Sequence, residues 1–294
     1  MTAPDFDLQS HSVHSDGALE PADVIAAAAA AGVRLVALSD HDTLAGIDAA
    51  LAAGAALGVE VVPSTEITVV DPVRDDLHLL GYRVDHHDAA LLDLLARSRA
   101  DRDGRAQRMA DALRELGWEL DDAILQAHSA AGLPIGRPHL AKAVLANPAN
   151  ERRLAEEGLD DVGPVIVKYL IPGAPAFRAR TMPEVPDAIA AIHAAGGVAV
   201  WAHPFWDLED PELVTATVRR FAEAGLDGVE AFYATHSSEQ TDMLVALCTE
   251  LGLLTTGSAD FHGPEHRLFG SFRAFSLYGH EPMLGPIAGQ TPVG

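Results

Sequence analysis

Residues 5–42 read DFDLQSHSVHSDGALEPADVIAAAAAAGVRLVALSDHD, and this stretch predicts a strand, a helix and a second strand. Asp5–Gln9 is the predicted first strand. Pro21 begins an alanine-rich helix that Gly32 ends, the usual asymmetry of helix termini. Val33–Leu38 is apolar and predicts a buried strand. Strands that alternate with helices in this way indicate an α/β protein with a parallel sheet, open or closed into a barrel.

The same alternation continues outward from this stretch and stops only in the middle of the chain. Further predicted strands are Val59–Val62, which Pro63 should end, Ile67–Val70, Leu77–Tyr82, Val198–Trp201, Gly228–Phe232 and Leu253–Thr256. Residues 88–180 are helical and charged, without a convincing pair of strands. We therefore expect a barrel domain from residues 1–87 and 181–294, interrupted by a mostly helical inserted subdomain at 88–180.

Composition restricts the class of partner. The formal net charge is -23, and a field of that sign repels long duplex nucleic acid and anionic membranes. A small phosphorylated substrate remains possible because bound metal ions reverse the charge locally. Cys248 is the single cysteine, which excludes an intrachain disulfide and favours a cytoplasmic location. We expect neither a signal peptide nor a membrane span.

Metal-ligating residue types recur near the ends of the predicted strands. There are five histidines, two aspartates and one glutamate, namely His11, Asp16, His41, Glu66, His78, His203, Asp260 and His262. Buried charge is costly unless it is paired or bound to a metal, and residues that follow parallel strands meet at one end of a barrel. Imidazole and carboxylate ligands without thiolate suit zinc, manganese or iron. The pattern therefore predicts a metal site.

These segments resemble, in order, the motifs of the PHP (polymerase and histidinol phosphatase) phosphoesterases. Asp7–Gly17 is similar to the opening motif, and the later motifs correspond to Asp40-His41-Asp42, Glu66, His78, Ala202-His203-Pro204 and Asp260-Phe-His262-Gly263. Within the insertion, Ile135–His139 and Lys168–Gly173 resemble the branch that includes nucleotide phosphatases and small-RNA exonucleases. The resemblance implies a distorted (β/α)7 barrel that holds two to three divalent metal ions.

The resemblance also implies how the ligands are shared. One ion would be held by His11, Glu66 and Asp260, the second by Glu66, His78 and His203, and the third by Asp16, His41 and His262. The family usually has His-x-His in its first motif, whereas this chain has Gln9-x-His11. An amide oxygen is a weak ligand, so the first ion is expected to bind loosely.

The implied reaction is hydrolysis of a phosphate ester by a metal-activated water, with Glu66 and Asp260 shaping the nucleophile. Arg137, Lys168 and Arg180 are candidates to bind the substrate, and His139 and His236 could protonate the leaving oxygen. We expect a nucleotide or short oligonucleotide as substrate. A histidinol-phosphatase-like monoesterase and a non-catalytic metal-binding scaffold remain as alternatives.

Overall fold

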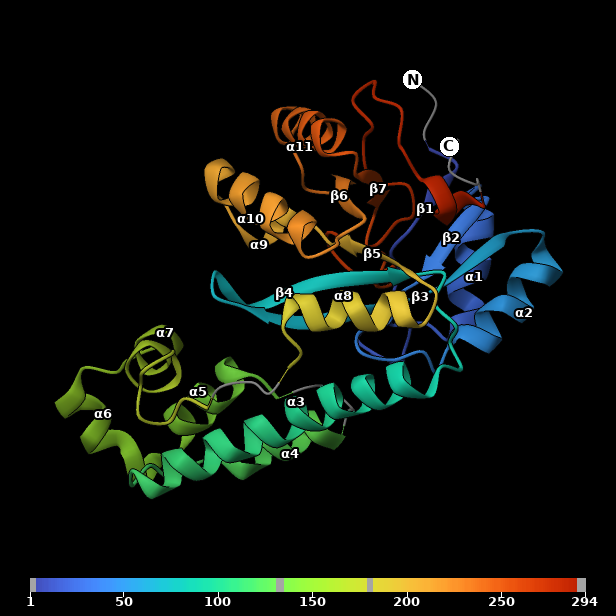
Figure 1. The fold of residues 1–294 in the computed structure, drawn as a ribbon. Coiled ribbons are helices and arrows are strands. Elements are labelled where there is room, and N and C mark those ends of the chain that lie inside the picture. The colour runs from blue at the N-terminus through green and yellow to red at the C-terminus, as the bar shows by residue number, and fades with distance from the viewer. Residues whose placement is uncertain (1–3, 131–134, 179–181, 290–294) are drawn as a thin grey trace. The chain divides into compact units, whose positions relative to one another are not determined.

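The computed structural model describes residues 4–130, 135–178 and 182–289 (Figure 1). The chain divides into two compact units, one formed by Met1–Ala96 with Met182–Gly294 and the other by Arg97–Thr181. No helix in the described ranges is both long and apolar enough to cross a membrane.

The first unit contains a seven-stranded sheet in which spatial order follows chain order. The strands are β1 (Phe6–Asp7), β2 (Leu35–Leu38), β3 (Glu60–Asp71), β4 (Arg74–Tyr82), β5 (Val198–Trp201), β6 (Gly228–Tyr233) and β7 (Leu254–Ser258). The backbone N–H of Leu8 donates to the carbonyl of Gly257 at 3.1 Å, so the first strand meets the last and the sheet nearly closes. The predicted distorted (β/α)7 barrel is confirmed.

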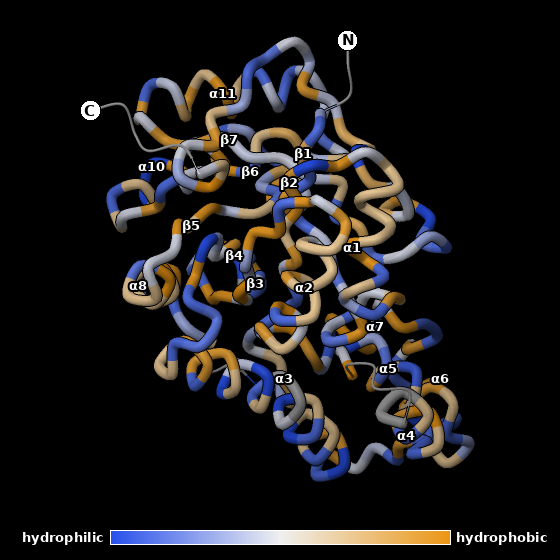
Figure 2. The backbone as a smooth tube through the Cα atoms, turned by 90° about the vertical axis from the view of Figure 1, so that its right-hand side faces the viewer, coloured by the Kyte–Doolittle hydropathy of each residue, from blue (hydrophilic) through white to orange (hydrophobic). Residues whose placement is uncertain are grey.

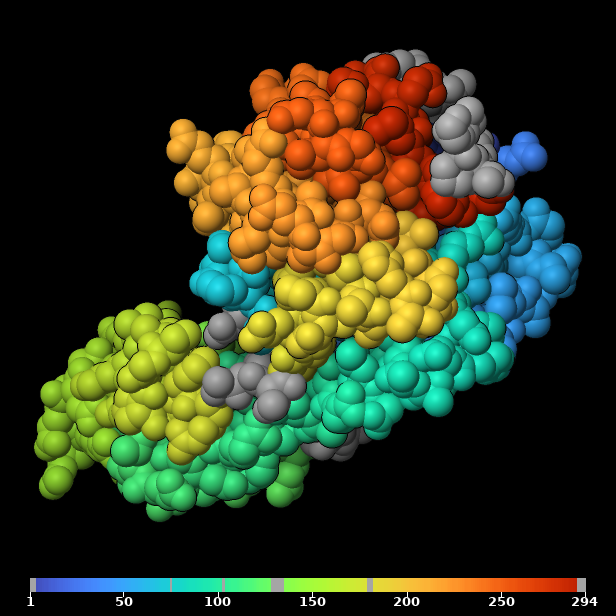
Figure 3. All heavy atoms as spheres, in the orientation of Figure 1, coloured from blue at the N-terminus to red at the C-terminus, as the bar shows by residue number. Residues whose placement is uncertain are grey.

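Helices surround this sheet. They are α1 (Pro21–Ala30), α2 (Ile47–Leu57), α8 (Val185–Ala194), α9 (Pro204–Asp207), α10 (Pro211–Glu223) and α11 (Ser238–Leu251), followed by the 3-10 turn η3 (Gly285–Ala288). In the space-filling view, the atoms of α8, α10 and α11 cover one side of the strands (Figure 3). Aliphatic residues such as Leu8, Val62, Leu80 and Val200 fill a separate buried cluster that five of the strands share.

One predicted strand boundary is wrong. Pro63 does not end a strand, because β3 runs through it without a break. Up to Pro63 the strand pairs in parallel with β2, and from Ser64 onward it pairs antiparallel with β4. Proline lacks an N–H to donate, and it lies where the strand changes partners. The strand β4 is also antiparallel to β5, so the sheet is mixed rather than wholly parallel.

The described part of the second unit is helical. Its elements are α3 (Ala89–Glu115), which begins in the first unit, α4 (Asp122–Ala130), α5 (Arg137–Ala146), η1 (Pro148–Asn150), α6 (Glu151–Glu157), α7 (Val162–Val165) and the π-helical turn η2 (Ile166–Leu170). Hydrophilic and hydrophobic residues alternate along α3 (Figure 2). A separate core that includes Leu113, Trp118 and Leu140 stabilises this unit.

Candidate metal centre

The eight candidate ligands come together in the first unit, although they come from six separate positions along the fold. His11 and Asp16 lie in the loop after β1, His41 follows β2, and His203 follows β5. Asp260 and His262 follow β7. Glu66 and His78 differ from the expectation, because they lie inside β3 and β4 rather than at strand ends.

The register of β3 and β4 explains why these two residues still meet. His78 lies opposite Thr68, two residues along the strand from Glu66. Residues two apart project from the same face of a strand, so Glu66 and His78 form a diagonal pair on one face. His78 Nδ1 is 2.9 Å from Glu66 Oε1.

Glu66 is the hub of the cluster. Its side chain is fully buried, and each carboxylate oxygen faces two imidazoles. Oε1 lies 2.9 Å from His78 Nδ1 and 3.1 Å from His203 Nε2. Oε2 lies 3.2 Å from His11 Nε2 and 3.5 Å from His41 Nδ1. The two oxygens of one carboxylate are thus directed to separate pairs of imidazole nitrogens.

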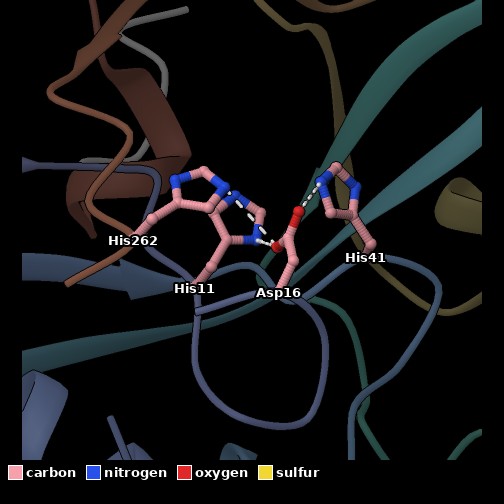
Figure 4. A group of neighbouring side chains, drawn as sticks. All are labelled: His11, Asp16, His41 and His262. Carbon is pink, nitrogen blue, oxygen red and sulfur yellow. Dashed lines mark ion pairs between the residues drawn. The ribbon is translucent and has the colours of Figure 1, made fainter. Parts of the chain in front are cut away.

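Asp16 forms a second focus (Figure 4). Its Oδ1 lies 3.6 Å from His11 Nδ1 and 3.5 Å from His262 Nε2, while its Oδ2 lies 3.6 Å from His41 Nε2. The side chains of Figure 4 thus converge on one carboxylate from three different loops. Asp16 is also the most exposed member of its group, with 40% of its side chain accessible.

Asp260 contacts histidines from both the group around Glu66 and the group around Asp16. Its Oδ1 is 3.1 Å from His11 Nε2 and 3.6 Å from His262 Nδ1, and its Oδ2 accepts a hydrogen bond from the Tyr233 hydroxyl at 2.7 Å. His11 therefore lies between Glu66 and Asp260, with both carboxylates in contact with the same ring nitrogen.

The residues fit divalent ions by an independent criterion. Among the described residues, His11 Nε2, His41 Nδ1, His78 Nδ1 and Asp260 Oδ1 are buried side-chain atoms whose close neighbours in the cluster do not have the geometry of a hydrogen bond. Buried polar atoms are normally satisfied, so a group of such atoms directed at one another suits a bound cation. Two overlapping sets have ligand atoms within 4.8 Å of one another, namely His11, Asp16, His41 and His262, and His41, Glu66 and His78.

The histidines and carboxylates of the cluster shift one another's pKa values. Burial alone would lower the pKa of His11 and His203, but neighbouring carboxylates outweigh it and raise both well above the usual value. Burial would raise the pKa of Glu66, but His41 and His78 hold it well below its usual range. For His41, burial dominates and lowers the pKa to about 3. Its ring is therefore neutral and able to ligate.

Known proteins resemble this arrangement and its sequence. Residues 7–148 match the PHP domain. A Haemophilus influenzae protein named 5'-3' exoribonuclease is 33% identical over 260 residues, which cover 88% of this chain and 90% of that protein. The chain belongs to the PHP family.

A second relative and a solved structure are also similar to this chain over most of its length. The 3',5'-nucleoside bisphosphate phosphatase of Chromobacterium violaceum is 32% identical over 88% of this chain and 87% of its own length. A solved structure from Bifidobacterium adolescentis, described as a metal-dependent phosphoesterase, superposes with a TM-score of 0.66 at 28% identity, covering 90% of this chain and 89% of its own. This PHP protein is a metal-dependent phosphoesterase that acts on a small phosphorylated substrate.

Gln9, where this PHP chain departs from the usual motif, is buried beside the hub. Its side-chain Nε2 donates to Glu66 Oε2 at 2.9 Å, and its Oε1 lies 3.4 Å from the Ser258 hydroxyl oxygen. The amide group thus has its nitrogen toward the glutamate. In this orientation Gln9 supports the position of Glu66 rather than offering an oxygen beside it.

A supporting layer that the sequence did not reveal holds the ligands of the PHP centre. Asp207 is buried with its Oδ2 3.5 Å from His203 Nδ1, one turn away on α9. Glu230 accepts from the backbone N–H of His203 at 2.9 Å and from the Ser258 hydroxyl at 2.6 Å. Burial raises the pKa of Glu230 to about 8. A glutamate inside an apolar strand such as β6 is the signal that could have pointed to it.

Strained backbone occurs at the same place. Asp42, His203 and Asp260 have positive φ values of 52°, 32° and 55°. Left-handed backbone is unusual for residues other than glycine and is concentrated at functional sites. Asp42 is held there by hydrogen bonds to its carboxylate from the backbone and hydroxyl of Thr68, at 2.9 and 3.0 Å.

The candidate substrate-binding residues belong to the second unit. Lys168 Nζ forms an ion pair with Glu157 at 2.9 Å. Arg137 is the first residue of α5, and His139 Nδ1 accepts from the backbone N–H of Gly136 at 2.9 Å. Arg180 lies outside the described residues. Their roles toward the substrate stay predictions.

His236, the second candidate acid, is buried in the first unit. Its Nδ1 is 3.2 Å from the carbonyl of Ala231, which assigns the ring proton to Nδ1, and its Nε2 is buried without a partner among the described residues. Burial lowers the pKa of His236 to about 4. At neutral pH its Nε2 is therefore bare and can accept a hydrogen bond, whereas donation to a leaving oxygen requires the ring to gain a proton first.

A third set of possible ligands lies on the surface. His86 Nε2 is 3.0 Å from Asp48 Oδ1, and His87 Nε2 is 3.9 Å from the same oxygen. The Asp48 side chain is 76% exposed, and an ordinary surface ion pair with His86 explains this geometry.

Proposed function

We propose that this PHP enzyme hydrolyses phosphate esters of nucleotides, with nucleoside bisphosphates and short oligonucleotides as its substrates. The observation that carries the proposal is the convergence of three carboxylates and five imidazoles around Glu66 and Asp16. The nucleotide class is supported by the relatives, one named an exoribonuclease and one a nucleoside bisphosphate phosphatase.

We propose that two to three divalent ions, zinc, manganese or iron, occupy the cluster. Three ligand sets, of which the first two share Glu66, would hold them: His11 with Glu66 and Asp260, then Glu66 with His78 and His203, and then Asp16 with His41 and His262. When bound, such ions acidify water and stabilise the charge on phosphoryl oxygens.

The residues of the chain supply position and charge. Glu66 holds four imidazoles in fixed directions, so it sets the spacing of the cluster. Tyr233 donates to one oxygen of Asp260 and leaves the other directed at His11. Asp40 accepts from the Ser12 backbone and hydroxyl at 2.7 and 2.6 Å and from the Ser15 hydroxyl at 2.7 Å, which fixes the loop that carries Asp16. These contacts orient the ligands before substrate arrives.

The test is a substrate panel assayed before and after chelation. The enzyme should release phosphate from adenosine 3',5'-bisphosphate, lose this activity with a chelator, and regain it with manganese or zinc. A higher kcat/KM for histidinol phosphate than for every nucleotide in the panel would favour the monoesterase instead. Absence of hydrolysis from all substrates in fully metal-loaded protein would favour the non-catalytic scaffold.

A further inference from the structure

An exposed tryptophan lies next to the metal centre. Trp206 has 49% of its surface accessible, whereas Trp118 and Trp201 are 1% and 0% exposed. Exposure of a large aromatic ring forfeits the free energy that its burial would give. A tryptophan at such a position is more informative than an exposed alanine, because binding sites are where aromatic rings are left accessible.

The position of this ring is fixed by residues of the centre itself. Trp206 belongs to the short helix α9, which follows His203 directly and ends at Asp207. Both of these residues are buried, and their side chains contact each other. The helix is thus held at both ends, and Trp206 is presented from a rigid support.

Two further rings connect Trp206 to the ligands. Its ring centroid lies 5.6 Å from that of Phe269 and 6.5 Å from that of Tyr233, with interplanar angles of 68° and 65°. Phe269 in turn lies 5.6 Å from the ring of His262, and the Tyr233 hydroxyl donates to Asp260. Trp206 therefore contacts the candidate ligand His262 through the ring of Phe269, and the candidate ligand Asp260 through Tyr233. Since both ring contacts are edge-on, neither covers the indole as a stacked ring does.

We propose that Trp206, supported by Phe269 and Tyr233, is a stacking surface for the base of the substrate, an inference that rests on the proposed nucleotide specificity. A nucleotide has a phosphate and a planar base joined by one sugar. The metal centre suits the phosphate, and the adjacent indole suits the base. Stacking is tolerant of base identity because every base has a π-face. It also does not depend on attraction of anions, which the net charge of -23 opposes.

The effect of removing the ring can be given as a fold-change. Base–aromatic stacking contributes about 1–3 kcal/mol per base, and each tenfold in affinity corresponds to about 1.4 kcal/mol. Trp206→Ala should therefore raise KM for adenosine 3',5'-bisphosphate by roughly 5- to 150-fold, with kcat little changed, because the base is bound alike in the ground and transition states. Trp206→Phe should recover most of the loss. The base-free substrate ribose 5-phosphate should show unchanged kinetics, which also checks that the variant is folded.

The matched control is Leu57→Ala, since Leu57 is equally exposed at 49% and lies on α2. This substitution should change the kinetics of neither adenosine 3',5'-bisphosphate nor ribose 5-phosphate. The stacking proposal is overturned if Trp206→Ala changes KM for the nucleotide less than about twofold, or changes both substrates equally.

Tryptophan fluorescence tests base stacking on Trp206 independently of whether the enzyme hydrolyses nucleotides. Because the other two tryptophans are buried, quenching on addition of adenosine 5'-monophosphate reports mainly on Trp206. Quenching that disappears in Trp206→Phe supports the stacking surface even if no nucleotide is hydrolysed, in which case only the proposed function fails. If nucleotides are hydrolysed without any quenching, and KM is normal in Trp206→Ala, the stacking proposal is wrong and the proposed function stands.

Discussion

Replacement of Glu66 by glutamine tests the hub of the centre while keeping its shape. A carboxamide has one oxygen and one NH2 group, so one side of the group ceases to accept. If the NH2 group replaces Oε1, the contacts with His78 and His203 are lost, and if it replaces Oε2, those with His11 and His41 are lost. Either orientation removes at least two of the four imidazole contacts.

The charge of the cluster changes as well. Its three carboxylates carry a formal charge of about -3, and the substitution leaves about -2 to face two or three divalent ions. We expect Glu66→Gln to lower kcat at least about a hundredfold, which corresponds to about 2.7 kcal/mol in activation free energy, and to lower the metal content. Steady-state kinetics and elemental analysis should be made on the same preparation.

Glu60→Gln is the matched control, because Glu60 is on the same strand with its side chain 53% exposed and ion-paired to Arg83. This variant should stay within about twofold of the parent, as surface pairs contribute little. Near-normal kcat in Glu66→Gln with full metal content would refute the assignment of Glu66 as the bridging group.

Three further predictions concern residues around the hub. Asp207→Asn removes the charge beside His203 Nδ1 and should weaken metal affinity or activity about 10- to 100-fold; metal titration with an indicator dye would measure this, and an unchanged dissociation constant would contradict it. Gln9→His should raise the metal retained after dialysis, and the reasoning fails if the parent protein already holds three ions as tightly. The folded-state pKa of His236 is about 4 against a reference of 6.5, so the unfolded chain binds more protons between these values, and stability is lost as the pH falls through this window. Between about pH 7.5 and about pH 5 the loss should be about 2 kcal/mol by urea denaturation, and His236→Phe should abolish that part of it.

Much of the barrel could be predicted from sequence because its signals are local. The apolar run Val198–Trp201 and the alanine-rich helix that begins at Pro21 depend on neighbouring residues alone, and the structure has both where they were expected. The end of β3 could not be predicted in this way. Pro63 usually marks a strand end, but here the strand changes partner at that residue, and a change of partner is a property of the sheet.

The site follows the same rule. The candidate ligands could be selected because histidine and carboxylate near strand ends are chemically conspicuous. Asp207, Tyr233 and Glu230 were missed, since each acts on a ligand through a contact that depends on the folded backbone. His203, which Asp207 contacts, has left-handed backbone, and no local pattern in the sequence predicts that conformation.

The left-handed backbone of Asp42, His203 and Asp260 has a consequence for handling the protein. Such residues cost about 1–3 kcal/mol each, and they persist only where their surroundings hold them. Any ion that binds His203 and Asp260 only in the folded chain adds its binding free energy to the stability of the whole barrel. Thermal melting should therefore shift upward with metal concentration, and exposure to chelators during purification should shorten the lifetime of the folded protein as well as stop turnover. Restoring metal soon after chelation separates these two effects, because lost chemistry returns at once whereas an unfolded barrel must first refold.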